Sequence, residues 1–205
     1  LDHHLHEERD KSRIGKVCAS LRREGIAILP LFRRVAAVDG EGAQGQAVEG
    51  VINGIFFNQG HVCCAGSRLY VQESVAKTVI RKLRDRMESL IVGDPLDKNT
   101  DIGAINSRQQ LETIHKYIRI GKQEGAEMYE SSCRLPGKGY FCRPTLFTNV
   151  AQSNRIAQEE IFGPVLAILT FRTDDEVIEK ANNSPYGLSA GVWTDKGSKI
   201  FNMTK

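Results

Sequence analysis

Two short segments of this 205-residue chain carry residue types that could do chemistry. The first is FFNQGHVCCAGSR, residues 56–68, where Cys63 follows an expected helix and precedes an expected strand. A cysteine thiolate is a nucleophile, and loop amides or a helix end can lower the pKa of its thiol. Gly60 lets the backbone approach another group closely. The alternative is that Cys63 and Cys64 are small hydrophobic residues buried at a packed turn.

A zinc site in the same segment is the weaker interpretation. His61, Cys63 and Cys64 are all residue types that bind zinc. Structural zinc sites, however, space their paired cysteines as C-x₂-C, and two adjacent cysteines do not match that spacing. We therefore assign no metal ligand in this chain.

The second segment is AQEEIFGP, residues 157–164, which places two carboxylates before an aromatic residue and a Gly-Pro pair. Neighbouring side chains on an extended segment point in opposite directions, so only one of Glu159 and Glu160 can face a pocket. Phe162 lies two residues after Glu160 and could share its face. The alternative is a charged loop that leads into the next strand.

Helical and strand patterns alternate along residues 46–205. Apolar residues recur at helical spacing in three segments, at 47–58, 73–93 and 107–125, and a further helix is expected at 174–184. Short apolar or alternating runs predict strands at 68–72, 126–131, 145–150, 165–173 and 188–194. This alternation predicts an α/β fold with a largely parallel sheet flanked by helices.

Residues 1–45 show no sustained apolar period. They begin with a segment rich in His, Glu and Arg, and a Gly-rich stretch at 39–45 ends them. We expect this leader to be poorly ordered or loosely packed, with the apolar piece 26–32 as an exception. The sequence leaves open whether the leader is native. The chain is therefore divided into a leader, 1–45, and an α/β unit, 46–205.

The composition excludes several classes of protein. Apolar residues make up 40% and charged residues 26%, as in ordinary globular proteins. The net charge of +3 gives no argument for nucleic-acid binding. The apolar run at 165–171 is far shorter than the roughly 20 residues of a membrane helix. Five cysteines, an odd number, are too few for a disulfide scaffold, which favours a reducing, cytoplasmic location.

Together, the two segments resemble the two signatures of the aldehyde dehydrogenase superfamily. FFNQGHVCCAGSR is similar to the cysteine signature, and IAQEEIFGPVLAI, residues 156–168, is similar to the second signature. Four further stretches fit in the same order: SRLYVQES, VGDPLDKNTDIGAI, GYFCRPTLFTNV and ANNSPYGLSAGVWT. The resemblance covers residues 47–205. The segments FFNQGHVCCAGSR and LPGKGYFCRPTLFTNV are also similar in sequence to members of the sixteenth aldehyde dehydrogenase family.

The resemblance implies an enzyme that oxidises an aldehyde to a carboxylic acid with NAD or NADP. Cys63 would attack the aldehyde carbon, a hydride would pass to the nicotinamide, and water would hydrolyse the resulting thioester. The backbone N–H of Cys63 would form part of the oxyanion hole. Glu160 would accept hydrogen bonds from the nicotinamide ribose, and Phe162 would pack near the nicotinamide. The family also implies an aldehyde substrate and a homo-oligomeric parent. From the net charge and the short apolar runs we expect neither a nucleic-acid nor a membrane partner.

The chain departs from the family pattern in three ways. The family usually has Gln or Glu where this chain has His61. Its general-base glutamate lies in a Glu-Leu-Gly-Gly motif, whereas Glu24, Glu41 and Glu49 are each followed directly by Gly. Nor does the chain contain a dinucleotide-binding domain.

These departures predict a partial catalytic domain that is inactive by itself, with the identity of the general base left open. One alternative is a non-catalytic, aldehyde-dehydrogenase-like interaction domain, which the missing base and cofactor domain suggest. Another is a thiol-dependent esterase that uses Cys63 alone.

Overall fold

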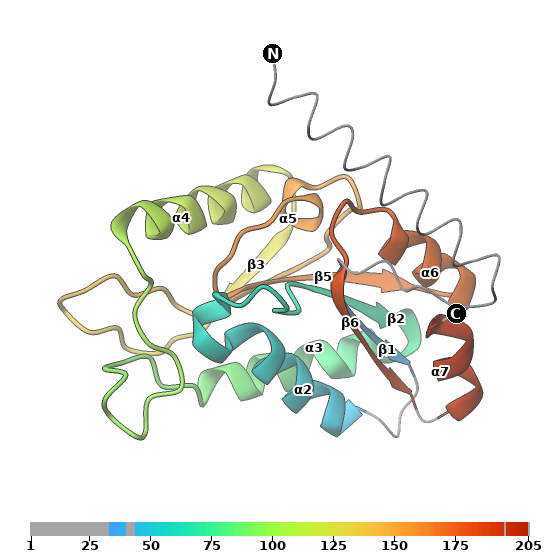
Figure 1. The fold of residues 1–205 in the computed structure, drawn as a ribbon, viewed down its shortest axis with the longest axis horizontal. Coiled ribbons are helices and arrows are strands. Elements are labelled where there is room, and N and C mark those ends of the chain that lie inside the picture. Colours follow the sequence, from blue (N-terminus) through green and yellow to red (C-terminus); the bar gives the residue numbers. More distant parts are fainter. Residues whose placement is uncertain (1–32, 40–43, 195, 205) are drawn as a thin grey trace, which may run out of the picture.

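The computed structural model describes residues 33–39, 44–194 and 196–204, which form a six-stranded sheet with helices on both faces (Figure 1). The strands are β1 Arg33–Asp39, β2 Arg68–Gln72, β3 Glu127–Glu130, β4 Thr145–Thr148, β5 Val165–Phe171 and β6 Leu188–Thr194. Their order across the sheet is β3-β4-β5-β2-β1-β6. Only the β3–β4 pair among these is antiparallel. The predicted α/β fold with a largely parallel sheet is confirmed.

Two groups of helices cover the sheet. The helical segments are α2 Gln44–Phe56, the 3₁₀ turn η1 Phe57–Gly60, α3 Glu73–Glu88, α4 Arg108–Gln123, α5 Arg155–Gln158, α6 Asp174–Asn182 and α7 Gly197–Thr204. Helices α2 and α3 pack on one face, and α4, α5 and α6 pack on the other (Figure 1). None of the described helices is long and apolar enough to span a membrane.

Strand β5 shows why both faces need helices. Leu166 and Ile168 pack with the residues of α2 and α3, whereas Val165 and Ala167 pack with those of α4 and α5. Successive side chains of a strand point to opposite faces, so a strand covered on both faces is apolar throughout. This is the reason that VLAILTF reads as a continuous apolar run.

Helix α4 begins and ends where its sequence signals place the boundaries. The Ser107 hydroxyl accepts a hydrogen bond from the Gln110 backbone N–H at 3.2 Å, which caps the first turn. Gly125 follows the helix with a φ of 86°, a conformation that favours glycine. The predicted helix at 107–125 is therefore confirmed with nearly the same bounds.

Helix α3 is shorter than its apolar pattern predicts, ending at Glu88 rather than at residue 93. Leu90 and Val92 are buried while Ile91 is 51% exposed, which is the alternation of an extended chain. Val92 forms a bridge with Ile102, and the Asp101 carboxylate accepts a hydrogen bond from the Ile91 N–H at 2.8 Å. Pairing with the loop segment that follows thus ends the helix.

Strand β1 corrects the expectation for the leader. Residues Arg33–Asp39 pair in parallel with β2 on one side and with β6 on the other, so they lie inside the sheet. The rest of the leader up to residue 32, including the apolar piece 26–32, lies outside the described residues, and so do residues 40–43.

Candidate functional site

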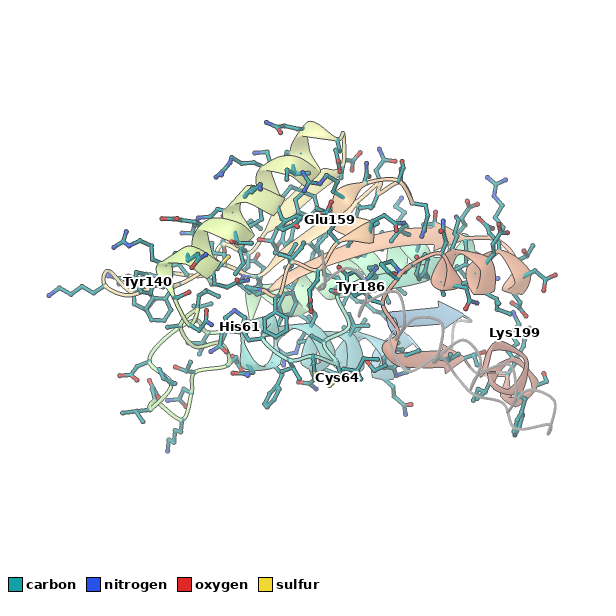
Figure 2. All side chains as sticks on the ribbon, turned by 45° about the horizontal axis from the view of Figure 1, so that its top comes forward. His61, Cys64, Tyr140, Glu159, Tyr186 and Lys199 are labelled. Atoms are coloured by element: carbon teal, nitrogen blue, oxygen red, sulfur yellow. The ribbon has the colours of Figure 1, made fainter. Side chains whose placement is uncertain are left out.

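The two chemically suggestive segments meet where β2 and β5 begin. These strands are parallel neighbours, with Arg68 opposite Ala167. Parallel neighbours start at the same edge of a sheet, so the loops that precede them are brought together. The cysteine loop, residues 61–67, thus lies beside the glutamate loop, residues 159–164. Figure 2 labels His61 and Cys64 of the cysteine loop and Glu159 of the glutamate loop.

The backbones of Gly60, just before the cysteine loop, and Gly163, in the glutamate loop, approach each other closely and join the two loops. A Cβ atom placed on Gly60 would lie 2.3 Å from the carbonyl oxygen of Gly163, closer than any side chain tolerates. Gly60 also has a φ of 72°, in the left-handed region. Only glycine satisfies both conditions, so the chain can bring the two loops this close.

The turn before the cysteine loop is sharply reversed. Asn58, Gln59 and Gly60 have φ values of 49°, 59° and 72°, three successive left-handed residues. The His61 backbone N–H donates to the Asn58 carbonyl at 2.9 Å, and the Asn58 side-chain amide donates to the His61 carbonyl at 3.3 Å. These bonds stabilise the turn at the end of α2, where the sequence predicts that the helix stops.

Cys63 and Cys64 are both exposed at a short turn between η1 and β2. Among the described residues, the backbone N–H of Cys63 donates no hydrogen bond, so it is available to a bound group. The Cys64 carbonyl accepts a hydrogen bond from the Ser189 hydroxyl of β6 at 3.0 Å. The alternative that Cys63 and Cys64 are small hydrophobic residues buried at a packed turn is wrong.

The remaining described cysteines are less accessible. Cys133 is half-buried, and Cys142 is buried. Burial raises the pKa of the Cys142 thiol to about 12, because the thiolate would lose its hydration. Cys142 is therefore a thiol at neutral pH. Cys18 lies outside the described residues.

The two adjacent glutamates differ in their surroundings. Glu159 accepts two hydrogen bonds from the Arg155 guanidinium, at 2.6 and 2.9 Å, and one from the Tyr117 hydroxyl at 2.6 Å. These partners lower the pKa of Glu159 to about 2. Glu159 has an extended backbone, so the side chain of Glu160 points the other way. Glu160 is half-buried and one of its carboxylate oxygens is inaccessible to solvent.

Phe162 is held in an unusual backbone conformation, with a φ of 56°. The side-chain amide of Gln110 donates to the carbonyls of Ile161 and Phe162, each at 2.9 Å. The Phe162 ring stacks on the His61 imidazole, with centroids 5.6 Å apart and planes 10° apart. The stack is therefore a second contact between the cysteine and glutamate loops.

Arg68 is a structural member of the site that sequence reasoning missed. It is 2% exposed and donates from Nη1 to the Ala157 carbonyl and to the Ser184 hydroxyl, both at 2.9 Å. Its guanidinium also lies 5.2 Å from the centre of the Tyr186 ring. An arginine in an otherwise apolar strand was the available signal. It connects β2 with the segments before β5 and before β6.

Glu49 is the upstream glutamate that falls within the described residues. It lies on α2, is exposed, and pairs with Arg86 of α3 at 3.0 Å. Glu24 and Glu41 lie outside the described residues. In the part of the chain that the structure describes, no group of three or more His, Cys, Asp or Glu side chains could hold a metal ion.

We expect Glu159→Gln to remove a pH dependence of stability. The folded pKa of Glu159, about 2, lies below its ordinary 4.5, so the unfolded chain binds more protons between these values. The stabilisation is thus present above pH 4.5 and is lost as the pH falls toward 2. Because the Glu159–Arg155 pair is partly exposed, this stabilisation should amount to less than about 1 kcal/mol.

Urea unfolding at pH 6 and pH 3 measures this effect. The loss of stability on acidification should be smaller in Glu159→Gln than in the unaltered protein. Glu112→Gln, at an exposed position of α4, controls for the removal of one carboxylate. An identical acid response in all three proteins would contradict the assigned pairing.

Comparisons with known proteins agree with this arrangement. The sequence model of the aldehyde dehydrogenase family matches residues 37–205. Putative aldehyde dehydrogenase DhaS of Bacillus subtilis is 47% identical over 151 residues, covering 73% of this chain and 30% of that protein. Human retinal dehydrogenase 2 is 44% identical over 158 residues, covering 77% of this chain and 30% of that protein.

Solved structures show the same fold. The NAD-dependent aldehyde dehydrogenase from Sinorhizobium meliloti superposes with a TM-score of 0.77 at 36% identity, covering 82% of this chain and 34% of that one. The NAD⁺ complex of an aldehyde dehydrogenase from Bacillus cereus gives 0.78 at 38% identity, covering 84% and 35%.

The chain spans about 30% of the length of the curated relatives that it matches. The family match starts at residue 37, within β1, whereas the resemblance seen in the sequence starts at residue 47. The family match includes both loops of the site and continues to residue 205. This chain belongs to the aldehyde dehydrogenase family.

Proposed function

We propose that this chain is part of a longer enzyme (the full-length protein) that oxidises an aldehyde to a carboxylic acid, with Cys63 as its nucleophile. The observation that carries the proposal is the contact between the two loops, which brings exposed Cys63 into one region with Glu160 and Phe162. The names of the relatives, which are aldehyde and retinal dehydrogenases, support the reaction class.

Cys63 supplies the covalent chemistry. Its thiolate attacks the aldehyde carbon, forming a C–S bond and moving the carbonyl electron pair onto oxygen. The free backbone N–H of Cys63 can donate to this developing oxyanion. Loss of a hydride from the same carbon leaves a thioester on the cysteine. A water molecule then adds to the thioester carbon and the C–S bond breaks. The carboxylic acid leaves, the remaining proton of the water is released to solvent, and the thiolate is restored.

NAD or NADP supplies the hydride acceptor. Glu160 and Phe162 fit the nicotinamide end of such a cofactor. A carboxylate can accept two hydrogen bonds from adjacent ribose hydroxyls, and an aromatic ring offers a flat apolar wall. The neighbouring Glu159 accepts hydrogen bonds from Arg155 and Tyr117, so we do not assign it to the cofactor. The NAD complexes among the solved relatives support NAD in particular.

We further propose that the 205-residue chain does not oxidise aldehydes by itself. It spans about a third of its solved relatives, and it contains no Glu-Leu-Gly-Gly motif to provide the base. Glu49 of α2 pairs with Arg86 of α3, so we do not assign Glu49 the role of general base. Loss of general-base help alone lowers rates by about 10²–10⁴-fold.

We also propose a cytoplasmic location, which the cytosolic rat relative supports. We further propose that the full-length protein is a homo-oligomer.

An acid-quench experiment tests the proposal. The full-length protein is mixed with a short aldehyde and NAD⁺ or NADP⁺, quenched, digested and examined by mass spectrometry. We expect NADH or NADPH formation and an acyl adduct on the peptide that contains Cys63. The isolated chain should show neither.

Three outcomes would contradict the proposal. One is an adduct on Cys64. Another is ester hydrolysis without any reduction of the nucleotide, which would favour a thiol esterase. The third is the absence of both adduct and turnover, which would favour a non-catalytic interaction domain.

A further inference from the structure

We infer that His61 is a positioning residue that holds the Phe162 ring as the aromatic wall of the nicotinamide site. The inference rests on the proposed function, because it assigns a role to a neighbour of that site. It starts from one contact. The His61 and Phe162 rings are nearly parallel, at 10°, with centroids 5.6 Å apart. The two residues come from loops about a hundred positions apart in the chain.

The backbone of Phe162 is restrained from one side and its ring from the other. Gln110 of α4 donates to the Ile161 and Phe162 carbonyls, which stabilises the left-handed conformation at φ 56°. That contact sets where the backbone lies. The flat face of the His61 imidazole lies against the ring itself. We therefore expect the ring orientation to respond to a change at His61.

The imidazole is suited to this role by its burial. Within the described residues, Nε2 of His61 has no hydrogen-bond partner and is inaccessible to solvent. Burial lowers the pKa of His61 from its ordinary 6.5, so the ring is neutral at pH 7. A neutral planar ring can stack on an aromatic neighbour, whereas a flexible glutamine or glutamate side chain presents no comparable face.

His61 is itself held rigidly. It follows the three left-handed residues of the turn, and its backbone N–H and carbonyl both bond to Asn58. The adjacent Gly60 touches Gly163 of the other loop. The imidazole is thus fixed relative to the loop that carries Phe162. A residue fixed in this way can restrain a neighbouring ring without contacting the substrate.

The consequence is a selective effect on cofactor binding. If Phe162 packs against the nicotinamide, releasing its ring weakens only the nicotinamide end. Binding of ADP-ribose should be unaffected, because this molecule lacks the nicotinamide ring that Phe162 would contact. A general loss of structure would instead weaken both.

The test measures dissociation constants of NADH and of ADP-ribose for the full-length protein and three variants. NADH binding is followed by its fluorescence, and ADP-ribose binding by calorimetry. We expect His61→Gln to weaken NADH binding about three- to tenfold, the range of an aromatic pair. The ADP-ribose constant should change less than twofold. His61→Phe retains a flat ring and should bind both ligands within twofold of the unaltered protein.

His115→Gln is the matched control, since it removes an exposed histidine of α4 far along the chain from both loops. It should change neither constant. Equal weakening of NADH and ADP-ribose in His61→Gln would overturn the inference, as would unchanged NADH binding. Should His61→Gln fail to fold, selective weakening of NADH by His61→Phe would overturn it instead. Failure of the unaltered protein to bind NADH would contradict the proposed function itself, which separates the two cases.

Discussion

Replacing Cys63 by serine is expected to lower the kcat of aldehyde oxidation by the full-length protein at least about 10³-fold, as loss of an enzyme nucleophile does. A serine hydroxyl is not ionised at neutral pH without a dedicated base, whereas a thiol reaches its thiolate far more readily. The decrease should be in kcat rather than in KM for the cofactor, since Cys63 reacts with the aldehyde. Steady-state kinetics of NADH formation measure both.

Cys64→Ser provides the matched control, because it changes the adjacent cysteine, which is also exposed. We expect it to retain at least about a tenth of the activity, a loss of under ~1.4 kcal/mol in transition-state stabilisation. The contact from Ser189 to the Cys64 carbonyl involves the backbone and survives the substitution. Greater loss in Cys64→Ser than in Cys63→Ser would show that the nucleophile is misassigned.

Replacing Gly60 by alanine is expected to destabilise the protein by about 2–5 kcal/mol, combining left-handed strain with overpacking. The new Cβ would lie 2.3 Å from the Gly163 carbonyl oxygen, a backbone atom that no rotamer change can remove. The φ of 72° adds strain that a side chain tolerates poorly. Urea unfolding of the full-length protein at pH 7 measures the change.

Gly54→Ala is the control for this substitution. Gly54 lies within α2, and nothing lies within 4 Å of a Cβ placed there. Alanine has the higher helix propensity, so we expect a stabilisation of up to about 1 kcal/mol. The assigned contact between the two loops would be wrong if the free energy of unfolding of Gly60→Ala lay within about 0.5 kcal/mol of that of the unaltered protein.

Local signals were sufficient where a segment's own residues decide its conformation. The helix at 107–125 was predictable because Ser107 caps it, Gly125 ends it and its apolar face is continuous. Strand β5 was predictable because VLAILTF is apolar on both faces. The left-handed turn at 58–60 coincides with Asn-Gln-Gly, whose glycine signals a helix stop. In each case the energetic preference lies within a few neighbouring residues.

Prediction failed where pairing with distant residues decides the outcome. Strand β1 has two arginines and two alanines in RRVAAVD, with no clear period, and its place is set by β2 and β6 on either side. Helix α3 ends early because Val92 pairs with Ile102. Each of these partners lies in another segment of the chain, and a local pattern contains no information about it.

The sequence by itself determined the kind of fold and, through family resemblance, the residues to consider: Cys63, Glu160 and Phe162. Their meeting place was decided only by the tertiary structure, because parallel pairing of β2 and β5 brings their preceding loops to one edge. The same pairing brings His61 against Phe162, where the two rings stack. Such contacts join segments about a hundred residues apart, so they depend on how whole strands align.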